Sequence, residues 1–310
     1  MNTPILAIVG ATATGKTRLA LALAHRLGAE IVGADASQIY RGLDIGTGKI
    51  GLAERGDVRH HLIDVVEPDA PFDAAAFVRL ADAALAEIRA RGRHPLLCGG
   101  TGLYLRALIE GLCEAPPVPE PIRATLAQRI DAGELPAIHA ELTAADPDAG
   151  RRIAPRDRQR VERALGVFLA TGRSMTDWQR AAAAQPPRHV VRYAGLTLSR
   201  PALNTRIEAR TRRMFADGLV DEVRALLERG HPPDLRSLQA LGYAQAAAVV
   251  AGTLRLEAAV EQTIVLTRQY AKRQETWFRA VPGVVWLDAE APLERNVESA
   301  TALLAPGAPA

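Results

Sequence analysis

Segment 10–17 constrains the fold of this chain more than any other, because it reads GATATGKT. An apolar run at 5–9 precedes it and helix-forming residues at 19–24 follow, so a strand, a loop and a helix are expected in succession. Gly10 and Gly15 allow the backbone to turn its N–H groups toward an anion, and the helix dipole adds positive charge at that point. The sequence therefore predicts a phosphate-binding loop.

Two side chains of this loop carry specific chemistry. Lys16 brings a mobile cation to the phosphates, and the Thr17 hydroxyl is placed to ligate Mg²⁺, which makes Mg²⁺ the expected cofactor. The pattern does not identify the phosphate compound. The predicted diphosphate or nucleotide site comprises Gly10, Ala11, Thr12, Ala13, Thr14, Gly15, Lys16 and Thr17.

Composition narrows the class of protein. The 310 residues are 48% hydrophobic and 24% charged, which is typical of a soluble globular protein with one large or two smaller domains. No apolar run approaches about 18 residues, and the N-terminus enters a strand without a basic, apolar leader, so we expect a cytoplasmic protein with no membrane contact. Cys98 and Cys113 are the only cysteines, which excludes a cysteine-rich zinc module.

Strand and helix patterns alternate along the chain. This alternation predicts an α/β doubly wound parallel sheet of the kind found in phosphate-loop NTPases. The expected strands are 5–9, 30–34, 61–66, 94–99, 190–198 and 284–287, and the expected helices of the sheet domain are 72–91, 103–111, 202–215, 220–229, 237–251 and 256–280.

A proline-rich stretch interrupts the alternation. Residues 114–121 read EAPPVPEP, and the following segment to about residue 184 has helical patterns without a strand candidate. We therefore expect a first part of the core at 1–113, an inserted helical domain at 114–187, and a return to the core at 188–310.

The inserted domain carries the excess positive charge. Segment 151–163 contains six arginines against Asp157 and Glu162, which is +4 within a chain of net charge +3. Such a run is often only a solvated helix face, but on an otherwise balanced chain it favours a nucleic-acid surface. Only Lys16, Lys49 and Lys272 are lysines, which makes them candidates for positions that need a compact ammonium.

Asp35 ends the second expected strand and begins a polar loop that extends to Lys49. The carboxyl ends of parallel strands meet at one edge of the sheet, so this acid is expected beside the phosphate loop. An aspartate there can accept the proton of a hydroxyl in a kinase, or of an amine in an alkyl transfer with diphosphate as the leaving group. It can also be a simple turn former. The loop and the acid do not choose between these chemistries.

The wider pattern resembles the tRNA dimethylallyltransferase family. The resemblance runs from about Pro4 to about Asp288. Six motifs carry it in order: GATATGKT at 10–17, DASQIY at 35–40, LDIGT at 43–47, GGTGLY at 99–104, QRVER at 159–163 and AKRQETW at 271–277.

The resemblance implies transfer of a dimethylallyl group from dimethylallyl diphosphate to the exocyclic amine of adenosine-37 in tRNA, with release of diphosphate. It implies that Asp35 is the general base, that Lys16 and Arg210 stabilise the leaving group, and that Thr101 contacts substrate. It further implies a monomer that binds the anticodon stem-loop of tRNA. The residues that match the family's tRNA-contacting positions are Asp35, Ala36, Ser37, Gln38, Thr101, Arg123, Gln159, Arg160, Val161, Glu162 and Arg163.

Some positions depart from the family pattern or have a second interpretation. Ala11 replaces the usual proline of the loop, and Ala36 replaces a serine, which removes a hydroxyl contact. Thr101 is also suited to cap the helix that follows it. The alternative functions are a small-metabolite kinase, an RNA-binding protein with a vestigial nucleotide pocket, and an enzyme that prenylates free adenine nucleotides.

Overall fold

The computed structural model describes residues 4–305, which form two compact units. Within this range the core unit comprises 4–109 and 189–305, and the insert comprises 110–188. The sequence places the insert at 114–187, so its first boundary lies four residues earlier in the structure (110 against 114) and its second one residue later (188 against 187). Each unit has its own hydrophobic core.

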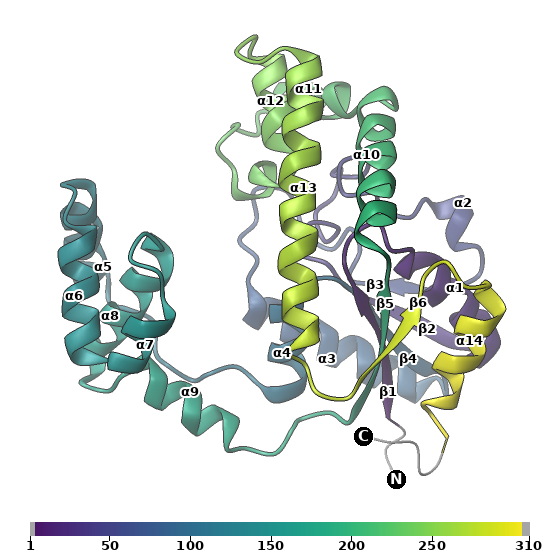
Figure 1. Cartoon of the computed structure of the whole chain (residues 1–310), viewed down its shortest axis with the longest axis horizontal. Coiled ribbons are helices and arrows are strands. Elements are labelled where there is room, and N and C mark those ends of the chain that lie inside the picture. Colours follow the sequence, from purple (N-terminus) through teal and green to yellow (C-terminus); the bar gives the residue numbers. More distant parts are fainter. Residues whose placement is uncertain (1–3, 306–310) are drawn as a thin grey trace. The chain divides into compact units, whose positions relative to one another are not determined.

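The core unit contains a six-stranded sheet with the order β3-β2-β4-β1-β5-β6, and every pairing is parallel (Figure 1). This arrangement confirms the predicted α/β doubly wound architecture. The strands are β1 Ile5–Gly10, β2 Ala29–Ala34, β3 His60–His61, β4 His94–Gly99, β5 Val191–Thr197 and β6 Val284–Asp288.

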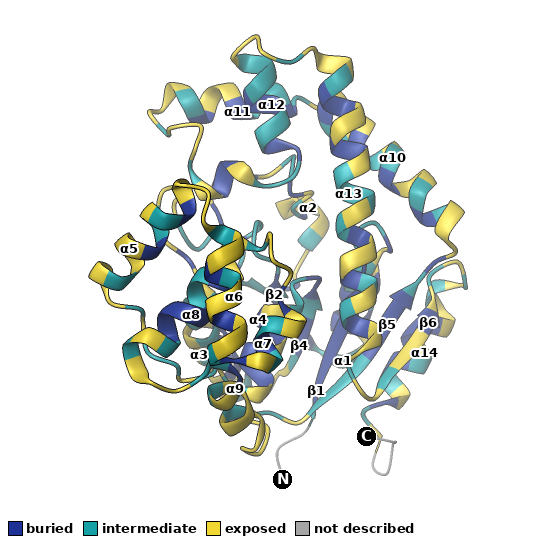
Figure 2. Cartoon of the chain, turned by 60° about the vertical axis from the view of Figure 1, so that its left-hand side comes forward, coloured by how far each residue is buried: buried dark blue, intermediate teal, exposed yellow. Residues whose placement is uncertain are grey.

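Strand β1 is buried on both faces, as Figure 2 shows. Its alternate side chains enter different cores, because successive residues of a strand point to opposite faces. Helices α1 (Lys16–Leu27) and α14 (Leu293–Ala302) cover one face. Helices α3 (Ala74–Ala90) and α4 (Gly102–Glu110) cover the other.

The long helices α10 (Arg200–Ala216) and α13 (Leu256–Arg279) lie side by side (Figure 1). Two shorter helices, α11 (Leu219–Glu228) and α12 (Tyr243–Val250), pack in the same core unit. The sequence patterns did not predict α14 or the single-turn helix α2 (Leu52–Arg55).

The predicted strand at 61–66 is wrong beyond its first residue. Strand β3 ends at His61, because Leu62 and Asp64 adopt left-handed backbone angles, with φ of 63° and 57°, that a strand cannot continue through. Val66 makes only an isolated bridge to Tyr40. The segment instead places the Asp64 carboxylate against a buried lysine.

The predicted helix at 237–251 is also corrected. The chain forms a 3₁₀ turn, η1 (Arg236–Gln239), and α12 begins only after Gly242, whose φ is 90°. The Ser237 hydroxyl donates to the carbonyl oxygen of Pro68, which ties this turn to the core. The break leaves residues 239–241 free to line a cavity.

All regular secondary structure among the described residues of the insert is helical, as predicted. Leu126, Ile138 and Leu165 belong to its own apolar core. No helix in the described part of the chain is long and apolar enough to cross a membrane. The helices of the insert are α5 Glu120–Asp131, α6 Leu135–Ala145, α7 Pro147–Arg152, α8 Arg158–Thr171 and α9 Met175–Ala183.

Candidate active site

The phosphate loop connects β1 to α1 and has the backbone that its glycines were expected to provide. Gly10 and Gly15 have φ of 137° and 94°, and Ala13 is held at 65°. A Cβ atom at Gly10 would lie 2.5 Å from the carbonyl oxygen of Leu196, so no larger residue fits there. The strand, loop and helix therefore follow one another as predicted, and the left-handed angle of Ala13 is a strained conformation that the loop maintains.

Lys16 begins α1 and turns back into the loop. Its Nζ atom donates to the carbonyl oxygen of Ala11 at 2.8 Å. Burial lowers the pKa of Lys16 to about 8, although Cys98 and Asp35 oppose this shift. The ammonium is therefore a cation that is incompletely compensated by its surroundings.

Arg210 reaches the same loop from α10. It donates from Nη1 to the Thr12 hydroxyl at 3.2 Å and from Nη2 to the Thr47 carbonyl oxygen at 3.0 Å. Burial lowers its pKa, with Asp35 acting in the opposite direction. Neither Lys16 nor Arg210 forms an ion pair with a carboxylate among residues 4–305, so together they make a site for an anion.

Asp35 follows β2 at the carboxyl edge of the sheet. Its Oδ1 atom accepts the backbone N–H groups of Ser37 at 2.9 Å and Gln38 at 3.3 Å. This is the turn-forming role considered from the sequence. The second carboxylate oxygen accepts no hydrogen bond from any residue that the structure describes, so it is available for other chemistry.

Thr101 does not cap α4 with its hydroxyl, which corrects one expectation from the sequence. The hydroxyl instead accepts the backbone N–H of Ala36 at 3.0 Å. It thereby fixes the turn after Asp35 to the end of β4. The Thr101 N–H donates to the Ala34 carbonyl oxygen, which strengthens this link between neighbouring strands.

Gln274 on α13 connects two loops, a role that its sequence motif did not reveal. Its side chain is buried, with Oε1 accepting the Thr12 N–H at 2.8 Å and Nε2 donating to the Gly100 carbonyl oxygen at 2.9 Å. A Cβ atom on Gly100 would lie 2.2 Å from this Nε2 atom. The phosphate loop and the loop that carries Thr101 are therefore held together by one amide.

A cavity of about 280 Å³ opens beside the phosphate loop. Five predicted site residues line it: Thr12, Ala13, Asp35, Ser37 and Arg210. Lys16, Thr17, Gln38 and Thr101 are not among its lining residues. The Gln38 amide instead donates to the Thr47 carbonyl oxygen at 3.3 Å.

Helix α13 supplies three cavity residues that no sequence motif indicated, Thr263, Thr267 and Tyr270, besides Arg273 of the 271–277 motif. The positions 263, 267, 270 and 274 are spaced by three or four residues and thus share one helix face, which is the signal that could have identified them. Burial raises the pKa of Tyr270 to about 12. Its hydroxyl therefore remains a hydrogen-bond donor near Asp35 at neutral pH.

The basic segment forms the end of α7 and the beginning of α8 in the insert. Arg158, Gln159 and Arg160 are exposed in the first turn of α8, and Glu162 is half-buried. Val161 is fully buried in the insert core, so its side chain is not available to RNA and the predicted contact is corrected.

Most arginines of this segment have partners within the insert. Arg163 donates to the carbonyl oxygens of Ala115 and Pro116, both at 3.0 Å, and so fastens the proline-rich stretch to α8. Arg158 pairs with Asp131 at 2.7 Å, whereas Arg160 has only a long contact of 3.5 Å to Asp157. Two further exposed arginines of the insert are also paired, Arg123 with Glu120 and Arg151 with Asp148.

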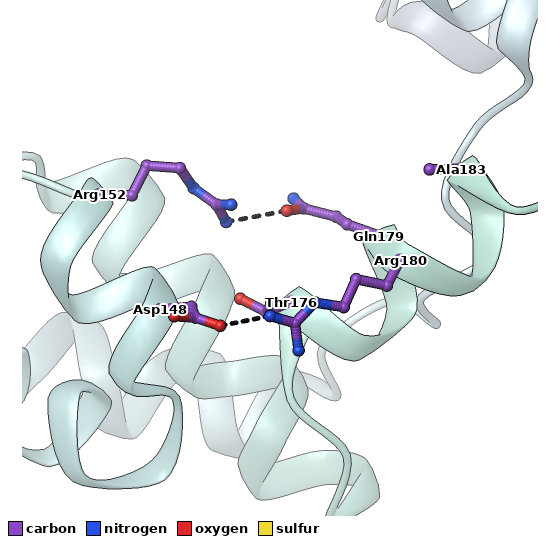
Figure 3. A pocket seen from close by; sticks show the side chains of 6 residues that line it. All are labelled: Asp148, Arg152, Thr176, Gln179, Arg180 and Ala183. Atoms are coloured by element: carbon purple, nitrogen blue, oxygen red, sulfur yellow. Dashed lines mark hydrogen bonds and ion pairs between the residues drawn. The ribbon is translucent and has the colours of Figure 1, made fainter.

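A second hollow, of about 480 Å³, lies between α7 and α9 (Figure 3). Arg152 donates to Gln179 across it at 2.9 Å, and Arg180 pairs with Asp148 at 2.5 Å. Arg180 is thus paired with a carboxylate, whereas Arg152, like Arg210, donates to a neutral oxygen.

Comparison with known proteins gives one consistent result. A model of the IPP transferase family matches residues 38–281. A tRNA dimethylallyltransferase of Anaeromyxobacter dehalogenans is 47% identical over 298 residues, covering 95% of this chain and 97% of the relative. The one from Geobacter metallireducens is 43% identical over 287 residues, covering 93% of each chain.

Solved structures agree with the sequence relatives. The tRNA isopentenylpyrophosphate transferase of Bacillus halodurans matches with a TM-score of 0.71 and 37% identity, covering 96% of this chain and 94% of that one. A eukaryotic dimethylallyltransferase, described as acting on tRNA, has a TM-score of 0.79 at 24% identity and supports the fold alone.

Proposed function

The chain belongs to the IPP transferase family, and from that premise we propose that it is a tRNA dimethylallyltransferase whose catalytic residues are those gathered around its phosphate loop. The reaction transfers a dimethylallyl group to the exocyclic amine of adenosine-37, on the 3′ side of the anticodon in tRNA. The donor is dimethylallyl diphosphate, and diphosphate is released.

One observation carries the assignment of the leaving-group site. Lys16 and Arg210 are two cations without a carboxylate ion-pair partner in residues 4–305, and both lie against the phosphate loop. Burying uncompensated charge is costly unless a ligand supplies the opposite charge. Diphosphate supplies it, and its negative charge grows as the carbon–oxygen bond breaks, so these cations stabilise the transition state more than the ground state.

Asp35 is the proposed general base. The amine lone pair is delocalised into adenine, so attack on the first carbon of the dimethylallyl group requires that the amine proton be accepted. The nitrogen–carbon bond forms, the carbon–oxygen bond to diphosphate breaks, and the proton moves to the second oxygen of Asp35. The other oxygen keeps its bonds to Ser37 and Gln38, which orients the carboxylate throughout.

The residues at the loop fit a magnesium ion that is shared with phosphates. The exposed Thr17 offers a hydroxyl oxygen, and no group of three or more potential metal ligands among His, Cys, Asp and Glu occurs in the described residues. Mg²⁺ commonly takes one or two protein oxygens and completes its shell with phosphates and water. When bound, Mg²⁺ would neutralise diphosphate charge, with Thr17 as its proposed protein ligand.

The cavity suggests the orientation of dimethylallyl diphosphate. Arg210 and Met214 are one turn apart on α10, and both line the cavity. The apolar lining residues include Met214, Ala240 and Leu241. We assign the diphosphate to the phosphate loop and the five-carbon chain to these apolar side chains.

We propose that the insert binds the anticodon stem-loop. Arg160 has the most loosely held guanidinium of the first turn of α8, and the positive end of the helix dipole adds to its field. We propose Arg123, Gln159, Arg160 and Glu162 as RNA-facing residues, with Arg163 holding the linker in place. The protein is further proposed to act as a cytoplasmic monomer.

The test offers the protein dimethylallyl diphosphate and Mg²⁺ with AMP, ATP or an anticodon stem-loop, and detects the prenyl mass. Gain of the mass by the stem-loop alone is expected. Gain by AMP or ATP would instead indicate an enzyme of free nucleotides, and phosphate transfer from ATP would indicate a kinase. Binding of the stem-loop without any chemistry would leave only an RNA-binding protein.

A further inference from the structure

Two residues with different proposed tasks share one hydrogen-bond acceptor. Arg210, which we propose stabilises the diphosphate, and Gln38, which matches a tRNA-contacting position of the family, both donate to the carbonyl oxygen of Thr47, at 3.0 and 3.3 Å. A shift of this oxygen would therefore displace both side chains. Residues 43–49, which we call the Thr47 loop, set its position.

Lys49 anchors the end of the Thr47 loop. Its side chain is only 3% exposed, and Nζ lies 2.5 Å from an oxygen of Asp44, 2.5 Å from an oxygen of Asp64 and 2.8 Å from the Tyr40 carbonyl oxygen. All three N–H donors of the ammonium thus have acceptors. A compact ammonium suits this enclosed position better than the wider fork of arginine, which gives Lys49 a reason to be one of the chain's three lysines.

Glu222 anchors the same loop from α11. It accepts the backbone N–H groups of Asp44 at 3.2 Å and Ile45 at 2.8 Å. The buried Tyr243 hydroxyl donates to Glu222 at 2.6 Å and orients the carboxylate. The Tyr243 ring also packs directly against Gly46, since a Cβ atom on Gly46 would lie 2.4 Å from a ring carbon of Tyr243.

Neither anchor lines the cavity, and neither contacts the phosphate loop. We propose that Lys49 and the Glu222–Tyr243 pair are positioning residues that fix the Thr47 carbonyl oxygen and thereby couple Arg210 at the diphosphate site to Gln38 at the tRNA-contacting site. The inference rests on the proposed function, because it takes from it the role of Arg210 and the tRNA substrate that Gln38 would contact.

The mild test is Tyr243→Phe, which keeps the ring against Gly46 and removes only the hydroxyl. Single-turnover dimethylallyl transfer should fall about tenfold, since small misplacements of substrate-positioning groups have effects of that order or larger. The affinity for the anticodon stem-loop should not change. Tyr104→Phe is the matched control, because this tyrosine is also buried but packs on Phe72 and Phe77 in the core.

A double-mutant cycle separates positioning from general destabilisation. The double variant Tyr243→Phe/Gln38→Ala should lose transfer rate by a factor at least about threefold smaller than the product of the two single-variant factors. The reason is that both side chains act through the Thr47 carbonyl oxygen. For the double variant Tyr243→Phe/Lys16→Ala, the loss of transfer rate should equal the product of the two single losses to within about twofold, since Lys16 bonds to Ala11 instead. Lys49→Arg should behave as Tyr243→Phe does in both cycles.

The outcomes distinguish two failures. If the parent protein modifies no anticodon stem-loop, the proposed function fails. If the parent is active but the Tyr243→Phe and Gln38→Ala losses multiply fully, or Tyr243→Phe transfers at the parent rate, the coupling through Thr47 is overturned while the function stands.

Discussion

The cations beside the phosphate loop and the arginines of the insert differ in what neutralises them. Lys16 and Arg210 donate to a carbonyl oxygen or a hydroxyl and have no carboxylate ion-pair partner in residues 4–305. In the insert, Arg158 and Arg180 sit on carboxylates. The sequence shows the opposite pattern, because its densest run of net positive charge is in the insert and not at Lys16 or Arg210.

This contrast indicates where positive charge performs chemistry. A guanidinium paired on a surface has little charge left to offer and contributes little free energy. A partly desolvated cation without an anionic partner is poised to receive one. We therefore expect substitutions in the core site to change the rate of transfer by orders of magnitude, and substitutions in the insert to change RNA affinity modestly.

Asp35→Asn should have the largest effect. The amide can still accept the Ser37 and Gln38 N–H groups through its oxygen, so the turn persists, but it cannot accept the amine proton. General base catalysis typically contributes about 10²- to 10⁴-fold. Single-turnover transfer at saturating substrates, with stem-loop affinity measured alongside, is the decisive experiment.

Retention of more than about a tenth of the parent rate would remove Asp35 from the base role. Asp44 and Asp64 are the acids that the sequence offers as replacements. The structure places both on the Lys49 ammonium, so neither is a ready substitute.

Lys16→Ala should lower the transfer rate by the next largest amount. Removal of one preorganised charge at the leaving group typically costs about 2.7 to 4 kcal/mol in the barrier. Affinity for the stem-loop should stay at the parent value, because the ammonium is proposed to bind the diphosphate and not the RNA. Parent-like transfer by this variant would contradict the leaving-group assignment.

The pH profile offers a second view of Lys16. Its pKa is lowered to about 8, so in the free protein the ammonium loses its proton as the pH rises through that value. The kcat/KM for dimethylallyl diphosphate should therefore fall about tenfold per pH unit above pH 8. Bound diphosphate favours the ammonium, so the fall in kcat should occur at higher pH. Lys16→Arg should abolish this decrease of activity at alkaline pH.

The fold and the site were predictable from sequence to different extents. The phosphate loop, five of the six strands and the helical insert follow from local patterns: glycine positions, apolar periodicity and a proline-rich boundary. The strand at 61–66 and the helix at 237–251 failed because tertiary contacts of Asp64 and Ser237 outweigh local preference.

The contacts that build the site are long-range, and the sequence did not predict them. Gln274 bonds to Thr12 across 262 positions of the chain, and Arg210 bonds to Thr47 across 163. A single sequence records neither distance. The helical spacing of Thr267, Tyr270 and Gln274 on α13 was visible, but their shared face could equally have been ordinary core.

Met214→Ala tests the orientation of the dimethylallyl chain in the cavity. Shortening this side chain enlarges the cavity, so the kcat/KM for geranyl diphosphate relative to dimethylallyl diphosphate should rise about tenfold, within the range that small changes of an apolar pocket produce. Met175→Ala in the insert is the matched control and should leave the ratio alone. An unchanged ratio in Met214→Ala would place the chain elsewhere.

Arg160 and Arg163 permit the finest comparison, because they are three residues apart in α8 and their substitution should have different effects. The Arg160 side chain is 72% exposed. Arg160→Gln should therefore reduce the slope of log K for stem-loop binding against log salt concentration by about 0.7 to 0.9, which is the effect of removing one phosphate interaction. Its thermal stability should not change. Arg163→Gln removes the bonds to Ala115 and Pro116, and should instead destabilise the insert by about 1 to 3 kcal/mol. Binding titrations across a salt series, paired with thermal unfolding of each variant, separate the two. An unchanged salt slope in Arg160→Gln would make the first turn of α8 a solvated face, and the division between chemical and RNA-facing charge would then have to be drawn elsewhere in the insert.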